Sequence, residues 1–451
     1  MPTRRVGTMR YIRRLMKTTS DTAHVIGAGL AGSEAAWQLA ARGIPVVLHE
    51  TKPAKMSPAH RSPLFAELVC SNSLRSDRLQ NAVGLLKEEM RRLGSLVLTS
   101  ADAARVPAGG ALAVDRDAFS SFITQSLKNH PLITVVEGEV TQFPDAPAII
   151  ATGPLTSEAL SEAILAQEGM GLLNFYDAAA PIVTKDSLDM RRVFRASRYE
   201  RGDDYLNCPL NREEYERFMA ALLGAETAEV NGFEDSKVFE GCMPVESMAK
   251  RGHMALAFGP MKPVGLVDPN TGEMPFAVVQ LRRDDAGDTL YNLVGFQTRL
   301  RFHEQRRVFG LIPGLENAEF ARYGVMHRNT FLNSPGVLDN LFQMRQRQGV
   351  YFAGQITGVE GYVESAASGL TAGIALSRQM KGEAPVYFPP VTAIGALGDY
   401  VSRYNRHFQP MNVTFGLMEP LKERVRGKEQ RYLRLADRAL EQIDALLPQL
   451  K

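Results

Sequence analysis

The chain has 451 residues, of which 45% are hydrophobic and 23% are charged, and its formal net charge is +2. This length gives room for two or three domains, and so small a charge does not by itself indicate a nucleic-acid partner. Three cysteines are too few for a disulfide framework and fit no zinc spacing, and no apolar run approaches the roughly 18 residues of a membrane span. The composition therefore predicts a cytoplasmic protein without a membrane segment or a metal site.

Residues 1–21 form a basic extension, in which arginine and lysine precede the first acidic residue, Asp21. The extension has no apolar core of the kind that a secretory signal needs. We expect either a disordered segment or a start codon placed too early, with Met9 or Met16 as alternatives. A basic arm that touches RNA is the other interpretation.

Residues 24–50 predict a strand, a glycine turn, a helix over 33–42 and a second strand over 45–48. The glycines have the G-x-G-x-x-G spacing, in which the first permits a tight turn, the second lets the backbone approach a pyrophosphate, and the third packs helix on strand. The helix N-terminus favours phosphate, and an acidic residue after the second strand binds the adenosine ribose. The residues predicted to bind a dinucleotide here are Gly27, Ala28, Gly29, Leu30, Ala31, Gly32 and Glu50.

The chain continues with a long loop over 51–78, which we expect to be functional because it is unusually long and too apolar for disorder. Helices are predicted over 84–98 and 113–129, and strands over 132–136 and 148–151. The last strand runs into Ala-Thr-Gly, which is common where a Rossmann sheet passes a flavin adenosine.

From about residue 181, short strands and Pro-Gly punctuation indicate a mixed α+β insertion. Residues 350–376 return to an apolar strand, a glycine turn and a long helix of small residues, so the first sheet is predicted to be completed after the insertion. Residues beyond 389 are predicted to be mostly helical. The basic tail over 422–438 is either a solvated helix face or a surface that follows phosphates.

The second glycine turn decides the cofactor, because an NAD enzyme needs one such turn and a chain with two is typical of an FAD protein. The positive helix end near residues 364–365 is expected to stabilise negative charge on a reduced isoalloxazine. Tyr362 is placed to stack on that ring or on the substrate, and a packing tyrosine is an equal alternative. The residues predicted to bind the flavin end are Gly354, Gln355, Gly361, Tyr362, Glu364 and Ser365.

The three cysteines differ in their surroundings. Cys70 precedes Ser-Asn-Ser, and if it opens a helix running towards Leu86, the helix N-terminus favours its thiolate. Cys242 lies between a glycine and a proline, outside any helix interior. Cys208 is predicted to be a small buried hydrophobe, the usual state of a free cysteine.

Several segments together resemble one family: VIGAGLAGSEAAWQLA, PAHRSPLFAELVCSNSLRSD, FEGCMPVE, KPVGL, YNLVGFQT, IPGLENAEFARYGVMHRNTF and AGQITGVEGYVESAASG. In combination they resemble the TrmFO family, the folate- and FAD-dependent tRNA (uracil-5-)-methyltransferases. The resemblance runs from about residue 22 to the C-terminal region and leaves out the basic extension.

The resemblance implies an α/β fold, with a Rossmann-type FAD-binding domain of the glutathione-reductase kind and an inserted mixed α+β domain. The first part of the FAD-binding domain is expected at 22–180, the insertion for folate and RNA at 181–325, and the second part with C-terminal helices at 326–451. The implied activity is formation of 5-methyluridine at position 54 of the tRNA T-loop. Methylenetetrahydrofolate supplies the carbon, and reduced FAD, recharged by NADPH or NADH, supplies electrons; no obligatory protein partner is predicted.

The two functional cysteines of the family fall on Cys70 and Cys242, and its flavin-stacking tyrosine falls on Tyr362. Uracil C5 is a poor nucleophile until a thiolate adds at C6, after which a second group must remove the C5 proton and a hydride completes the methyl group. A free thiol is only slightly ionised at neutral pH, so one must be activated. Cys242 is favoured as the nucleophile, with Cys70 as the base or as the guard of the flavin methylene adduct, and the roles remain open.

The insertion is expected to hold folate and RNA through basic residues, for which a solvated face is the alternative. His303 is a candidate to stack on the pterin, and His327, Arg328 and Asn329 form either a substrate contact or a hydrogen-bonded domain junction. The other candidates for the folate glutamate tail or RNA phosphates are Arg282, Arg283, Arg299, Arg301, Arg306 and Arg307.

Three other functions are compatible with parts of this sequence. A GidA-like modifier of wobble uridine, working with a GTPase, belongs to a longer family with a large C-terminal helical domain. Methylation of ribosomal RNA uses the same chemistry, and no motif excludes it. A flavin-carrying RNA-binding protein without methylation activity would tolerate serine at both Cys70 and Cys242.

Overall fold

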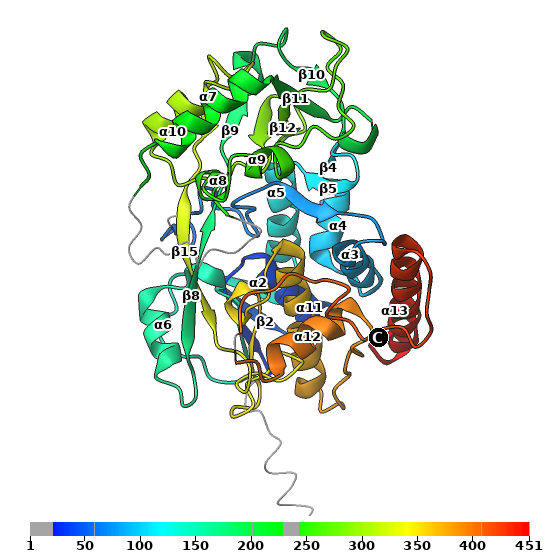
Figure 1. The fold of residues 1–451 in the computed structure, drawn as a ribbon. Helices are drawn as coiled ribbons and strands as arrows, with labels where there is room; N and C mark the ends of the chain where they lie inside the picture. Colours follow the sequence, from blue (N-terminus) through cyan, green and yellow to red (C-terminus); the bar gives the residue numbers. More distant parts are fainter. Residues whose placement is uncertain (1–20, 58, 201, 229–242, 407, 451) are drawn as a thin grey trace, which may run out of the picture.

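The computed structural model describes residues 21–450 except for 58, 201, 229–242 and 407 (Figure 1). The predictions for residues 1–20 and for Cys242 lie outside the described residues. Within the described part, no helix is both long and apolar enough to cross a bilayer, and no group of histidine, cysteine and acidic side chains is placed to hold a metal ion.

The two glycine turns belong to one parallel five-stranded sheet with the order β16-β7-β1-β2-β6. β16 pairs with β7 although the whole insertion separates them in sequence. Both are apolar and fully buried, as strands are in a parallel sheet covered on both faces. The strands are β1 (Ala23–Ile26), β2 (Val46–Glu50), β6 (Ile133–Glu137), β7 (Ala148–Ile150) and β16 (Val350–Phe352).

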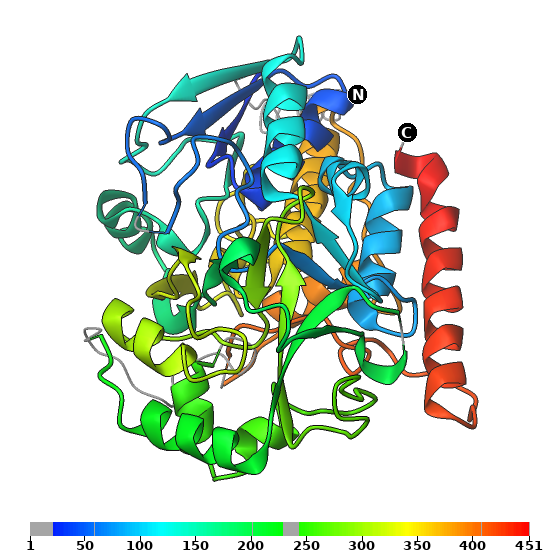
Figure 2. The same ribbon diagram turned by 90° about the horizontal axis from the view of Figure 1, so that it is seen from above.

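Two helices follow the glycine turns: α2 (Leu30–Ala41) and α11 (Tyr362–Met380). α2 begins before the predicted residue 33, because the chain turns at Gly29, which is the N-cap. α12 (Ala393–Ser402) and α13 (Lys428–Leu450) complete the C-terminal part. α13 lies at one edge of the molecule in both views, beside α3, with its basic N-terminal residues exposed (Figures 1 and 2).

A small antiparallel sheet, β3-β5-β4, lies beside the parallel sheet with three helices. The helix predicted over 84–98 is divided into two helices, because Gly94 has a φ of +74° and Ser95 starts a new helix by accepting a hydrogen bond from the Leu98 N–H at 3.2 Å. The predicted helix over 113–129 begins later, after a strand. The elements are β3 (Ser73–Ser76), α3 (Ala82–Arg92), α4 (Leu96–Ala103), β4 (Arg105–Val106), β5 (Ala111–Val114) and α5 (Arg116–Lys128).

The inserted part forms a second, antiparallel sheet with the order β10-β11-β12-β13-β9-β14 and a separate apolar core. α7 and α10 lie against it in the upper half of Figure 1. Its strands are β9 (Ile182–Thr184), β10 (Phe194–Arg195), β11 (Tyr205–Leu210), β12 (Ala277–Arg283), β13 (Leu290–Leu293) and β14 (Phe320–Arg322). Its helices are α7 (Arg212–Leu223), α8 (Val245–Ala249), α9 (Ala255–Phe258) and α10 (Phe302–Phe309).

A long antiparallel ladder of β8 (Leu172–Ala178) and β15 (Met326–Leu332) connects the two halves, as the chain enters and leaves the insertion (Figure 1). Short helices fill the remaining connections: the 3-10 turns Gly153–Leu155, Lys185–Ser187, Arg198–Glu200 and Gln355–Thr357, and α6 (Glu158–Leu165). The cavity described next lies where this ladder, both glycine turns and the inserted sheet meet.

Candidate active site

One cavity of about 780 Å³ is lined by residues of both glycine turns, by the loop that carries Cys70, and by Arg282 of the insertion. A volume of this size suits a cofactor or a substrate. The predicted residues among its lining are Gly27, Gly29, Leu30, Ala31, Glu50, Cys70, Arg282, Asn329, Gly354, Gln355, Gly361, Tyr362 and Ser365.

The first glycine turn has the crowding expected of a dinucleotide motif. A Cβ on Gly32 would lie 1.7 Å from the Gly27 carbonyl oxygen, and a Cβ on Gly27, where φ is +97°, would lie 2.7 Å from the Ala151 carbonyl oxygen. A Cβ on Gly29 would meet nothing within 4 Å, so this position faces open space. Glu50 accepts a hydrogen bond from the Ala28 N–H at 2.7 Å, which fixes its carboxylate beside the turn.

The second turn is held by its own side chains. The Gly354 N–H donates to Ser368 Oγ at 2.7 Å, and Gln355 donates to Glu360 at 2.8 Å. Gly361 has a φ of +111° and is the N-cap of α11, and the Ser365 hydroxyl donates back to its carbonyl at 2.7 Å.

Glu364 occupies the first turn of α11, but it lies outside the cavity lining. Its buried carboxylate forms an ion pair with Arg75 and accepts a hydrogen bond from the Val413 N–H at 3.0 Å. A Cβ on Gly361 would lie 2.3 Å from Glu364 Oε2, so glycine is needed at that N-cap. The helix end near residue 364 therefore carries more than the positive charge predicted for it, because the Glu364 carboxylate and the Arg75 guanidinium lie there as an ion pair.

Close packing of α2 on α11 brings the two turns together. A Cβ on Gly369 would lie 2.1 Å from the Ala31 carbonyl oxygen, and one on Gly373 would lie 2.8 Å from the Ala35 carbonyl oxygen. Only glycine allows the two helix backbones to approach this closely. The distance between the two turns is thus set by residues outside the G-x-G-x-x-G motif.

Cys70 does not open a helix, and this prediction is wrong. The next regular element is the strand β3, and α3 begins only at Ala82. Its neighbour is instead Tyr362, whose hydroxyl oxygen accepts from the Cys70 N–H at 2.7 Å and lies 2.9 Å from Cys70 Sγ. The Ser71 N–H donates to the same oxygen at 3.3 Å.

This geometry decides what the Tyr362 hydroxyl does. Since its oxygen accepts from backbone N–H groups, its own hydrogen is available to Cys70 Sγ, and a thiolate is the stronger acceptor. Burial raises the pKa of Tyr362 well above its ordinary value, and a neighbouring Cys70 thiolate acts in the same direction. Tyr362 therefore stays neutral, and its hydroxyl donates to the sulfur when Cys70 is a thiolate.

The predicted basic cluster of the insertion is largely occupied by internal ion pairs, in agreement with the alternative of a charged face. Arg283 pairs with Asp288 at 3.0 Å, and Arg301 with Glu226 at 3.4 Å. Arg307 pairs with Glu304, Arg299 lies 3.9 Å from Glu246, and Arg306 lies over the ring of Tyr323. Of the arginines proposed there, Arg282 alone lines the cavity within the described part of the chain.

The remaining predicted residues are distributed unevenly. Asn329 is buried in β15 and lines the cavity, whereas His327 and Arg328 are described by their strand position only. His303 lies in the first turn of α10 with 63% of its side chain exposed and lies outside the cavity lining. Cys208 is fully buried in the insertion core, as predicted, and burial raises its pKa.

Sequence reasoning missed two arginines near Cys70. Arg75 lies within the SLRSD segment, whose nearness to Cys70 was a usable signal. Arg116 begins α5 and carries no local signal, because its contacts are all made with residues far away in sequence.

The chain has clear relatives. A family model described as "Glucose inhibited division protein A" matches residues 22–384. A Listeria innocua protein named "Methylenetetrahydrofolate--tRNA-(uracil-5-)-methyltransferase TrmFO" is 59% identical over 429 residues, which cover 95% of this chain and 99% of that protein. A Heliobacterium modesticaldum protein of the same name is also 59% identical over 429 residues, with 94% and 98% coverage.

Among solved structures, Aquifex aeolicus GidA has a TM-score of 0.65 at 15% identity, over 95% of this chain and 75% of that chain. A second crystal form of the same protein has a TM-score of 0.63 at 16% identity, over 94% and 76%. At this identity the likeness concerns the fold alone. Together with the parallel sheet, it confirms the predicted α/β, Rossmann-type architecture.

Proposed function

Because the chain belongs to the TrmFO family, within the glucose-inhibited division protein A family, we propose that it methylates C5 of uridine in tRNA, with methylenetetrahydrofolate as the carbon donor. The observation that carries this proposal is the 59% identity to a TrmFO protein over 95% of the chain. The GidA-like alternative is not favoured, because the Listeria innocua TrmFO protein is 59% identical to this chain, whereas Aquifex aeolicus GidA is 15% identical.

FAD is proposed to lie along the cavity between the two glycine turns. The pyrophosphate would lie at the N-terminus of α2, where Gly29 leaves open space, and the ribose beside Glu50. The flavin end would lie against Gly354, Gly361 and Tyr362. Bound FAD supplies two electrons to complete the methyl group, and we infer that NADPH or NADH restores them.

Cys70 and Cys242 are proposed as the catalytic pair. A thiolate that adds to C6 of uracil makes C5 nucleophilic, and a second group then accepts the C5 proton. We assign the addition to Cys242 and the proton transfer to Cys70, whose sulfur lies 2.9 Å from Tyr362 in the cavity. Tyr362 stabilises the Cys70 thiolate by donating its hydroxyl hydrogen, so that more Cys70 is present at neutral pH in the deprotonated form that can accept a proton.

The insertion over 181–325 is proposed to hold folate and RNA above the flavin-binding parts, 22–180 and 326–451. Asn329, in the connecting ladder, faces the same cavity, so we propose it as a substrate contact together with its strand neighbours His327 and Arg328. His303 remains a candidate for a contact with RNA or folate outside the cavity. We place the modified uridine at position 54 of the T-loop and the enzyme in the cytoplasm, with no obligatory protein partner.

The test is a methylation assay with the purified protein and a T-arm minihelix. We expect 5-methyluridine to form only with methylenetetrahydrofolate and a reductant, and the arms with NADPH and NADH identify the preferred one. Methylation that depends on S-adenosylmethionine and ignores folate would overturn the proposal. Modification of ribosomal RNA, with the minihelix untouched, would overturn the assignment to tRNA.

The cysteine roles are tested with 5-fluorouridine RNA, which cannot lose a proton at C5 and traps the thiol adduct. We expect Cys242→Ala to abolish the trapped complex and Cys70→Ala to retain it. Cys208→Ala is the matched control, because Cys208 lies in the core of the insertion. If both single variants at Cys70 and Cys242 still form the adduct, the thiol mechanism is wrong.

A further inference from the structure

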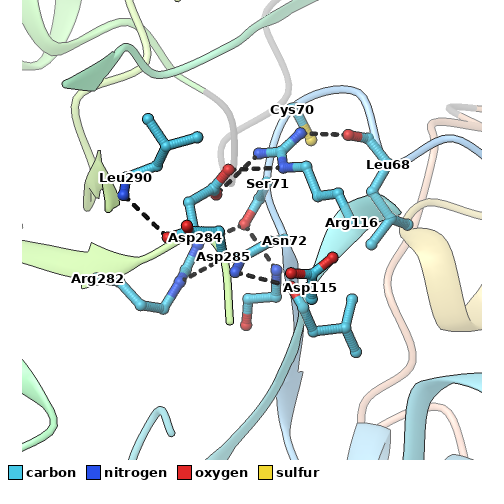
Figure 3. Close-up of polar contacts among 12 residues, drawn as sticks. Leu68, Cys70, Ser71, Asn72, Asp115, Arg116, Arg282, Asp284, Asp285 and Leu290 are labelled. Atoms are coloured by element: carbon cyan, nitrogen blue, oxygen red, sulfur yellow. Dashed lines mark hydrogen bonds and ion pairs between the residues drawn. The ribbon is translucent and has the colours of Figure 1, made fainter. Parts of the chain in front are cut away.

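Two arginines from different parts of the chain hold the loop that carries Cys70 (Figure 3). Arg116, at the start of α5, donates to the carbonyl oxygen of Leu68 and lies 3.4 Å from that of Val69. Arg282, in β12 of the inserted sheet, donates from Nη2 to Ser71 Oγ at 2.7 Å and from Nε to Asn72 Oδ1 at 3.0 Å. Residues on both sides of Cys70 are therefore bound by guanidinium groups.

The two guanidinium groups differ in their charge balance. Arg116 forms an ion pair with the buried carboxylate of Asp284, at 3.0 Å and 3.2 Å from its two oxygens. Arg282 is also buried, but among the residues that the structure describes no carboxylate forms an ion pair with it. Its acceptors are a hydroxyl and an amide oxygen, both neutral. A buried cation is costly without an anion, and the Asp284 carboxylate, which pairs with Arg116, acts on Arg282 without forming an ion pair with it, so further negative charge nearby is favourable.

The Cys70 sulfur can supply this further negative charge. Burial lowers the pKa of Arg282, whereas Tyr205, Asp284 and an ionised Cys70 act in the opposite direction. Both residues line the same cavity. The Tyr362 hydroxyl approaches the sulfur from α11. A Cys70 thiolate would therefore be stabilised both by the positive charge of Arg282 and by a hydrogen bond from Tyr362.

Asn72 makes the arrangement rigid. Its amide nitrogen donates to the Val114 carbonyl oxygen and to the Arg283 carbonyl oxygen, each at 3.0 Å. Val114 ends β5 of the small sheet, and Arg283 ends β12 of the inserted sheet. With Arg282 on its amide oxygen, Asn72 joins both sheets, so the loop is tied to the inserted sheet as well as to the small sheet.

We propose that Arg282 is a positioning residue, which fixes the Cys70 loop from the inserted sheet and adds to the positive charge of Arg116 in stabilising the Cys70 thiolate. The proposal rests on the proposed function in one respect, namely that Cys70 acts as a thiolate. A direct contact of Arg282 with an anionic part of folate or RNA is the competing interpretation, and the test below separates the two.

The test measures the rate of Cys70 alkylation by iodoacetamide as a function of pH, in the FAD-loaded Cys242→Ala protein. Cys208 stays silent because it is fully buried. Removing a nearby charge shifts a pKa by about one unit or more, so we expect Arg282→Gln to slow alkylation at pH 7 roughly tenfold. Arg283→Gln is the matched control: its side chain pairs with Asp288, and we expect no change.

Arg282→Lys separates charge from position. Lysine keeps the charge but cannot reproduce two parallel contacts, so we expect a near-normal alkylation profile with a lower kcat for methylation and an unchanged KM for RNA and folate. Loss of flavin absorbance would report that Arg282→Gln does not fold. In that case Ser71→Ala provides the test, because it removes only the 2.7 Å contact and keeps the charge, and we expect it to lower kcat as Arg282→Lys does.

An Arg282→Gln protein with an unchanged alkylation profile overturns the proposal. So does a rise in KM for RNA or folate with kcat unchanged in Arg282→Lys and Ser71→Ala, which would mark a substrate contact. Alkylation needs neither RNA nor folate, so this result is independent of whether the protein methylates tRNA. Failure of the proposed function would appear instead in the minihelix assay with the unmodified chain.

Discussion

Gly369 offers the sharpest test of how the two glycine turns are held together. It lies in α11 where that helix crosses α2, and an added Cβ would lie 2.1 Å from the Ala31 carbonyl oxygen. Ala31 also touches the second turn, because a Cβ on Gly354 would lie 3.0 Å from its side chain. Gly369→Ala is therefore expected to push the two turns apart and to weaken FAD binding.

The magnitude follows from two opposing terms. Alanine is favoured over glycine inside a helix by about 1 kcal/mol. Against this, the new methyl group must move about 1 Å further from a backbone oxygen, and overpacking of this kind costs about 3 kcal/mol when the obstacle is backbone. The net loss is about 2 kcal/mol of folding free energy. If the apoprotein relieves the clash by separating the turns, FAD binding must bring them back together, and the affinity for FAD falls by at most roughly thirtyfold.

The assay is a titration of the apoprotein with FAD, followed by flavin fluorescence, together with a thermal unfolding curve. Gly224→Ala is the matched control, because Gly224 ends α7 with a φ of −90° and its Cβ would meet the nearest atom at an ordinary 3.5 Å. An unchanged FAD affinity and Tm in Gly369→Ala would refute the reasoning from helix contact. An equal loss in the control would show that the effect is not specific to the α2–α11 crossing.

Two further predictions concern charges next to the site. Arg75→Gln leaves the buried Glu364 carboxylate without its cation, so we expect a lower Tm and weaker FAD binding, by about 1–3 kcal/mol because Arg75 is 39% exposed. The control Arg191→Gln breaks an exposed pair and should leave both the Tm and the FAD affinity unchanged. Burial lowers the pKa of Lys87 from 10.5 to about 7. Below pH 7 this lysine is charged in both the folded and the unfolded state, so folding carries the full cost of burying its charge. Above pH 7 the lysine loses its proton in the folded state but keeps it in the unfolded state. The free energy of unfolding should therefore rise between about pH 7 and 9 by up to about 1.4 kcal/mol per pH unit. Denaturant titrations at several pH values should show that the free energy of unfolding of Lys87→Met rises less steeply with pH than that of the unmodified protein. An equal dependence on pH would contradict this assignment.

The parts of the fold that depend on local pattern are predictable from the sequence. The glycine spacing, the alanine-rich helix and Glu50 predict the first turn, and the structure reproduces its crowding at Gly27 and Gly32. The return of the sheet near residue 350 is predictable for the same reason, because small residues and glycines repeat the pattern. The apolar period over 84–98 is continuous and predicts one helix, but the chain breaks at Gly94, which has a positive φ, and a new helix is capped by Ser95.

The surroundings of Cys70 are beyond local reasoning. The composition after Cys70 suggested a helix cap, yet the sulfur lies against Tyr362, 292 positions away, and Arg282 binds Ser71 from a distance of 211 positions. No periodicity or spacing relates such residues, since their contact arises when three elements pack. The resemblance to a family indicated that Cys70 matters, but it could not indicate what surrounds the sulfur.

The order of these partners along the chain explains how the site depends on the whole fold. Residues 69–72 form no helix or strand, so side-chain contacts must fix their conformation. Arg116 comes from before the insertion, Arg282 from within it, and Tyr362 from after it. Hydrogen bonds of 2.7–3.0 Å do not survive a displacement of about 1 Å, so Cys70 is placed only when all three segments have docked. A movement of the inserted sheet that followed RNA binding would therefore act directly on the thiol, because Arg282 and Asn72 belong to the same set of contacts.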